Sequence, residues 1–146
     1  MAIQDRSFNT DGSLFYNAQL EDAFKGDKIT VNGKVWPYLN VDQGKYRFRL
    51  LNGSQSREYI FELKNLSGIP STTTGFVDPH FTLVGTDEGL VSAPIDLTSK
   101  FGRIAPAERF DVVIDFEGYP AGTEIVLRNA EQTPPLVPNI MQAAMF

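Results

Sequence analysis

Few side chains in this chain could carry out chemistry on their own. Its 146 residues include one histidine, His80, and no cysteine. Thiolate nucleophiles, zinc ribbons, iron–sulfur clusters and blue-copper centres each need at least one cysteine. Sites built on paired imidazoles need two histidines. The composition therefore removes most metal chemistry from this chain, and we expect it to hold no metal or cofactor of its own.

His80 follows Asp78-Pro79 and precedes Phe81, so it lies where a loop enters a strand. A lone histidine at such a junction is more often a surface or capping residue than a catalyst. A Ser-His-Asp arrangement has no support, because the chain contains no Gly-x-Ser-x-Gly elbow. We therefore assign no catalytic residue to this chain.

The most suggestive carboxylates are Asp87 and Glu88, within the stretch 85–89. Glycoside hydrolysis needs two carboxyl groups that face each other across a cleft, whereas adjacent strand residues point to opposite sides. A turn with a solvated carboxylate is the favoured interpretation. Asp111 and Asp115, four residues apart, share one strand face, which favours a solvated face as well.

Glu108 and Arg109 stand where a strand begins, and the planar guanidinium of Arg109 offers several donors to neighbouring loop backbone. We interpret this pair as a structural latch. Glycine-rich phosphate loops are absent, so nothing in the sequence indicates nucleotide chemistry.

Charge and hydropathy exclude two classes of partner. The chain has 13 basic and 18 acidic residues, a net charge of −5, and its basic residues are scattered rather than gathered. A protein that binds the phosphate backbone should collect Lys and Arg on one face, so we expect no nucleic-acid partner. No apolar run approaches the roughly 20 residues of a membrane span, and the polar start is unlike a signal peptide. No compartment is indicated.

The elements that must position these side chains are short strands. Lys28–Val31 leads into Asn32-Gly33, a strong hairpin signal, and residues 34–36 return. Residues 45–51 and 59–64 each alternate apolar with polar residues, as strands with one buried face do. Further strands are predicted at residues 81–84, 103–104, 111–116 and 124–128.

Seven or eight such strands indicate an all-β Greek-key sandwich or barrel. A length of 146 residues favours one domain, residues 1–146. Residues 1–26 form a lead-in segment that we expect to pack on or beside it, with a possible helical turn at 20–24. Residues 65–79 are too polar, and too broken by Gly and Pro, for a strand, and they predict a long surface loop.

Four stretches together resemble a known family. They are Ile3–Phe8 with Asp11–Leu14, Val31–Pro37, Tyr46–Ser54 and Ala105–Val112. In order and spacing they resemble the middle domain of three-domain multicopper oxidases, most closely the bacterial spore-coat laccase and bilirubin oxidase branch. The stretch Asn139–Gln142 resembles that domain's exit towards the third domain.

The resemblance implies a cupredoxin-like fold and a copper-free role. In this family the third domain holds the type 1 copper, and the trinuclear copper cluster lies between the first and third domains. Those two domains would be the partners of this chain. The parent enzyme would use copper to oxidise phenolic or bilirubin-type donors and reduce dioxygen to water. This chain alone would be inactive, and apolar surfaces bared by excision could cause self-association.

The resemblance also implies that the middle domain lends loops to a pocket for an aromatic small-molecule substrate. The matching positions are Ala23, Phe24, Lys25, Gly26, Ser56, Arg57, Gly85, Asp87 and Gly89. Two departures from the relatives stand out: Lys25 replaces an uncharged residue, and the loop 65–79 is longer.

Two other functions stay open at this stage. One is a free-standing binding or adhesion module, with Trp36, Tyr38 and Tyr59 as an aromatic platform. The other is a small hydrolase that uses Asp87 or Glu88 together with His80.

Overall fold

The computed structural model describes residues 1–17, 23–97, 102–130 and 139–145. Within these residues every regular element is a β-strand, so the all-β prediction is confirmed. The helical turn expected at residues 20–24 lies largely outside the described residues. Across the described ranges there is no helix long and apolar enough to cross a membrane.

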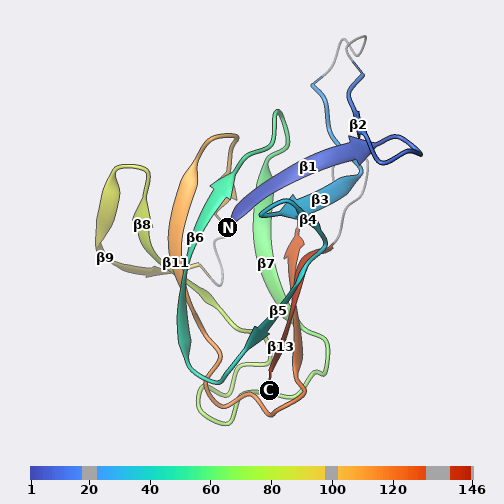
Figure 1. Ribbon diagram of the computed structural model, residues 1–146. Coiled ribbons are helices and arrows are strands. Elements are labelled where there is room, and N and C mark those ends of the chain that lie inside the picture. Colours follow the sequence, from blue (N-terminus) through green and yellow to red (C-terminus); the bar gives the residue numbers. More distant parts are fainter. Residues whose placement is uncertain (18–22, 98–101, 131–138, 146) are drawn as a thin grey trace.

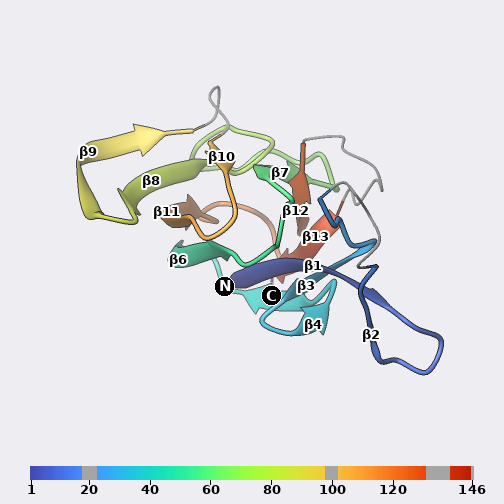
Figure 2. The ribbon, with the colours of Figure 1, turned by 90° about the horizontal axis from the view of Figure 1, so that it is seen from above.

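The strands form two sheets packed face to face, as predicted for a sandwich (Figures 1 and 2). The first sheet has the order β4 (Lys34–Val35), β3 (Lys28–Val31), β1 (Ala2–Phe8), β6 (Lys45–Asn52), β11 (Arg109–Asp115), β8 (Phe81–Thr86) and β9 (Gly89–Asp96), and β2 (Leu14–Phe15) pairs with β1. The second sheet has the order β10 (Arg103–Ile104), β7 (Tyr59–Asn65), β12 (Glu124–Asn129), β13 (Asn139–Met145) and β5 (Tyr38–Val41).

Alternation along β6 and β7 supplies both walls of the core, as the sequence predicts. The inward positions are Tyr46, Phe48 and Leu50 in β6, and Tyr59, Phe61 and Leu63 in β7. The basic residues between them in β6 are exposed. The predicted hairpin is also present: Asn32 and Gly33 have φ angles of 49° and 83° between β3 and β4.

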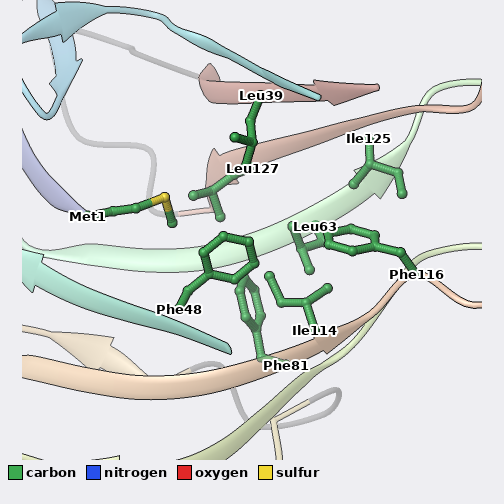
Figure 3. A pocket seen from close by; sticks show the side chains of 9 residues that line it. All are labelled: Met1, Leu39, Phe48, Leu63, Phe81, Ile114, Phe116, Ile125 and Leu127. Atoms are coloured by element: carbon green, nitrogen blue, oxygen red, sulfur yellow. The ribbon is translucent and has the colours of Figure 1, made fainter. Parts of the chain in front are cut away.

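Among the described residues, the core between the sheets contains a small apolar void. The volume of the void is about 10 Å³. Figure 3 shows the side chains that line it, with Phe48 and Phe81 from one sheet, Leu63 and Leu127 from the other, and Met1 beside them. A water molecule needs about this much space and also two or more polar partners. Because the lining is apolar, this void does not suit a bound water molecule.

Several strands carry no clear pattern in the sequence. β1 lies in the middle of the first sheet, between β3 and β6, whereas we expected residues 1–26 to be a lead-in segment packed on or beside the domain. Its inward face includes a charged residue, Asp5, which hides the usual alternation. β9 is exposed along nearly its whole length and contains Pro94, so it also lacks the pattern. β5 and β13 pair in parallel at the edge of the second sheet.

The two ends of the sandwich hold different loops (Figure 1). One end, here the turn end, carries residues 23–26, the β6–β7 turn (53–58), the β8–β9 turn and the β10–β11 turn (105–108). The opposite end, here the loop end, carries residues 66–80 and the β11–β12 turn (116–123).

Candidate functional site

A buried ion pair lies at the turn end. Arg57 Nε donates to Asp5 Oδ2 over 3.0 Å, and neither side chain is exposed at all. The Gly26 amide donates to the same Asp5 Oδ2 over 2.7 Å, and the Gly26 carbonyl accepts from Arg57 Nη2 over 2.9 Å. One carboxylate therefore ties together β1, the segment 23–26 and the β6–β7 turn.

The segment 23–26 packs tightly against β1. A Cβ atom at Gly26 would lie 2.4 Å from the backbone nitrogen of Arg6, so only glycine fits this close approach. Phe24 is 8% exposed and its ring lies against that of Tyr16, with centroids 5.3 Å apart. Lys25 is half-buried, and Ala23 is the exposed member of the segment.

Ser54 and Tyr59 extend the hydrogen-bond network of the ion pair towards the core. Ser54 Oγ accepts from the Asp5 backbone nitrogen over 3.1 Å and bonds Tyr59 Oη over 2.9 Å. Burial raises the pKa of the Tyr59 phenol, so this hydroxyl stays protonated across the physiological range. The polar network thus continues from the loop into the core.

Asn52 links the β6–β7 turn to the β10–β11 turn. Its Nδ2 donates to the carbonyls of Arg57 and Ile104 over 2.8 and 3.0 Å, and its Oδ1 accepts from the Ser54 amide over 3.0 Å. Its backbone bonds both Ala107 and Glu108. The side chain is fully buried, so the two turns form one rigid unit.

Glu108 and Arg109 bond neighbouring loops. Glu108 Oε2 accepts from the Ala105 amide over 2.6 Å, which closes the β10–β11 turn. Arg109 Nε lies 2.7 Å from Asp87 Oδ1, and the same oxygen accepts from the Arg109 amide over 3.0 Å. This geometry attaches the β8–β9 turn to the start of β11.

The nine predicted pocket residues thus lie at one end of the molecule, in two groups. Gly26 and Arg57 are in direct contact, whereas the β8–β9 turn joins the rest through Arg109 and the β10–β11 turn. The exposed members are Ala23, Asp87 and Gly89; Lys25 and Ser56 are half-buried; Phe24, Gly26, Arg57 and Gly85 are buried.

Residues 66–80 lie far from this group, at the loop end. Asn65 holds the start of the loop: its Nδ2 donates to the carbonyls of Ile69 and Val77, over 2.7 and 2.9 Å. Ser71 Oγ donates to the Glu117 carbonyl over 2.6 Å, which fastens the loop to the β11–β12 turn. The loop therefore covers the opposite end from the candidate pocket.

A surface pocket of about 160 Å³ opens beside this loop. Lys64 Nζ lies in it, 2.8 Å from Asp78 Oδ2 and 3.1 Å from Glu62 Oε1. The hydrogen bonds that the Lys64 ammonium donates to the Asp78 and Glu62 carboxylates raise the pKa of Lys64. Burial opposes ionisation of Glu62, but hydrogen bonds from Arg128 and Lys64 lower its pKa overall. The charges in this pocket satisfy one another and leave little to attract a ligand.

The hydrolase hypothesis fails on distance. His80 precedes β8, and Asp87 and Glu88 follow it, so the length of the strand, about 20 Å, separates them. His80 instead packs on Phe76, with ring centroids 4.1 Å apart, and its Nδ1 lies 3.8 Å from Asp96.

The proposed aromatic platform is incomplete as well. Trp36 and Tyr38 are exposed, but Tyr59 is fully buried between the sheets. Its ring stacks on Phe61 with centroids 5.5 Å apart. Tyr59 is therefore a core residue and not part of a binding surface.

The residues of this chain do not fit a copper ion. A type 1 centre takes two His and one Cys, and the chain has one His and no Cys. Among the described residues no three His, Cys, Asp or Glu side chains are grouped so as to hold a metal.

The amino-acid sequence is similar to those of known proteins. No family model matches the chain. It is 39% identical to a laccase of Bacillus subtilis (strain 168) and 41% identical to a laccase of Bacillus stratosphericus, in each case over 97% of this chain. The aligned part covers only 28% and 29% of those laccases, so the chain spans less than a third of their length.

Solved structures give the same result. The McoA multicopper oxidase of Aquifex aeolicus superposes with a TM-score of 0.80 at 30% identity, over 99% of this chain and 30% of McoA. A laccase of Pediococcus acidilactici superposes with a TM-score of 0.72 at 31% identity, over 99% of this chain and 27% of that laccase.

The chain is thus a cupredoxin-like domain homologous to part of the multicopper oxidases, which confirms the resemblance seen in its motifs. More particularly, it matches bacterial laccases over less than a third of their length.

Sequence reasoning overlooked Asp5 and Asn52, the two residues on which the turn end depends. One signal was available for Asp5. It stands two residues after Ile3, and strand alternation places residues two apart on the same face. An aspartate on an inward face requires a buried partner, and that partner is Arg57.

Proposed function

We propose that this chain is the copper-free middle domain of a laccase-type multicopper oxidase. In that role it joins the two copper-bearing domains and lends the turn end to the substrate pocket. One observation supports this most strongly. Nearly the whole chain aligns with laccases, yet its donor set contains one His and no Cys.

Arg57 then acts as a positioning residue rather than a substrate contact. Its guanidinium is buried and bonded to Asp5 and to the Gly26 carbonyl, so it holds the segment 23–26 in place. The surfaces left for a substrate are those of Ala23, Ser56 and the β8–β9 turn. An aromatic phenolic donor is the substrate class we propose.

Exposed apolar side chains mark where neighbouring domains would dock. The β1–β2 hairpin projects from the body of the sandwich and exposes Phe8, Leu14 and Phe15 (Figure 2). Exposed apolar side chains grouped in this way are typical of protein contacts. The chain alone should therefore self-associate, and a concentration-independent monomer in sedimentation velocity would contradict this.

Metal analysis and an assay test the copper-free role. After dialysis against Cu²⁺ and removal of free metal, the chain should retain less than one copper per molecule and should not oxidise a phenolic donor. Stoichiometric copper or turnover by this chain alone would overturn the proposal.

A pair of matched variants tests the pocket in a full-length enzyme that contains this domain. Ala23 lies at the turn end and Ala121 at the loop end, and both are exposed. Ala23→Trp should raise the KM for a phenolic donor and leave type 1 copper absorption unchanged. Ala121→Trp should change neither. Equal KM values in the two variants would place the pocket elsewhere.

A further inference from the structure

Asparagine followed by glycine occurs twice in the chain, at Asn32-Gly33 and at Asn52-Gly53. In this dipeptide the glycine nitrogen can attack the side-chain carbonyl carbon of asparagine, because glycine has no side chain to shield it. Ammonia leaves and a cyclic succinimide forms. One water molecule then opens the ring and gives aspartate or isoaspartate, so the net change is amide plus water to acid plus ammonia.

Asn32-Gly33 lies at the exposed tip of the β3–β4 hairpin. Both residues are exposed, and no atom lies within 4 Å of the position that a Cβ of Gly33 would occupy. The turn therefore has room to rotate towards the attacking geometry, and water reaches it freely.

The neighbouring strand supplies a polarising donor. The Ala2 backbone N–H donates to Asn32 Oδ1 over 2.8 Å. Attack on the amide carbon builds negative charge on this oxygen, and a donor already in place stabilises that charge. Pairing with β1 thus makes the Asn32 side chain more electrophilic.

Asn52-Gly53 has the opposite surroundings. The Asn52 side chain is fully buried, and both ends of its amide are bonded. The Gly53 nitrogen, which would be the nucleophile, donates to the Ile3 carbonyl over 2.8 Å. The attack would have to break the bond of the Gly53 amide and those of Asn52 Nδ2, at a side chain that is inaccessible to water.

From this contrast we infer that Asn32-Gly33 is a site of spontaneous deamidation in the folded protein, whereas the fold protects Asn52-Gly53. The product carries one more negative charge. Where isoaspartate forms, the turn backbone gains an extra carbon atom, which disturbs the pairing of Ala2 with Asn32.

Peptide mapping tests this inference with an internal control. Trypsin releases residues 29–34 and 50–57 as separate peptides, and each contains one Asn-Gly. The folded chain is incubated in mildly alkaline buffer, digested at intervals and analysed by mass spectrometry with chromatographic separation of isoaspartate. We expect the 29–34 peptide to convert at least about tenfold faster, because the 50–57 site must first open locally.

The same incubation in concentrated urea provides the second arm. Unfolding should bring the deamidation rates of Asn32 and Asn52 close together, since in each case a glycine follows the asparagine and does not hinder the attack. Equal rates in the folded chain, or faster conversion of Asn52, would overturn the inference. So would a difference between the two sites that persists unchanged in urea, because it would then owe nothing to the fold.

Discussion

The two ends of the sandwich are built alike around an asparagine but differ in where they place charge. Asn52 and Asn65 each stand last in a strand, and each donates to two backbone carbonyls while its Oδ1 accepts from a loop amide. The turn end adds a fully buried ion pair, Asp5 with Arg57. The loop end adds Lys64 with Asp78, which remains about one-third exposed.

The buried ion pair fixes the geometry of the turn end more than it adds to the free energy of unfolding. A buried ion pair is costly to desolvate and gains little net free energy, but loss of one partner leaves an uncompensated charge. An exposed pair costs little to form and little to lose. The turn end is therefore the end that tolerates least change.

The largest expected effect is that of Arg57→Met. It leaves the Asp5 carboxylate buried without its cation, so the free energy of unfolding should fall by about 3–5 kcal/mol. Urea denaturation measures this. The double variant Asp5→Leu with Arg57→Met should recover much of the loss, because no buried charge remains. A double variant no more stable than the single one would show that the ion pair is not the cause.

A smaller effect separates the two asparagines. Asn52→Ala leaves two buried carbonyls and one amide unsatisfied, which should cost about 2–3 kcal/mol. Asn65→Ala frees groups near solvent, where water can replace the lost bonds, and should cost about 1 kcal/mol. Chemical denaturation of both variants in one buffer compares them. Equal losses would remove the distinction between the two ends.

The smallest effect concerns pH at the loop end. Hydrogen bonds from Arg128 and Lys64 outweigh burial and hold the folded-state pKa of Glu62 below its unfolded value. The stabilisation is therefore complete above the unfolded pKa and is lost as pH falls through the lowered folded pKa. Glu62→Gln should be less stable than wild type at neutral pH and should lose less on acidification. Parallel pH profiles of stability would contradict this.

The sequence predicts the strands that have one wet face and one buried face. β6 and β7 follow that rule, and so does the Asn32-Gly33 hairpin. β1 and β9 do not follow this rule, for opposite reasons. β1 buries a charged residue, whereas β9 is exposed along nearly its whole length. Alternation of apolar and polar residues reveals the buried face of a strand only where the buried residues are also apolar.

For the candidate site, the family resemblance supplies the candidate loops, but local sequence does not predict the contacts that hold them. The contact between Arg57 and Asp5 joins residues 52 positions apart, and Asn52 reaches Ile104 over the same separation. No local pattern encodes such pairings. The sequence therefore suggests that Arg57 is exposed in a pocket, whereas in the fold its side chain is buried and paired with Asp5.

The parallel pairing of β5 with β13 has a consequence for how the chain reaches its native state. Tyr38 stands opposite Gln142, so the second sheet acquires its edge only after almost the whole domain has been synthesised. Pairings of such long sequence separation slow folding and keep strand edges open meanwhile. On the ribosome the domain should wait for its last strand, with β12 unprotected until β13 emerges.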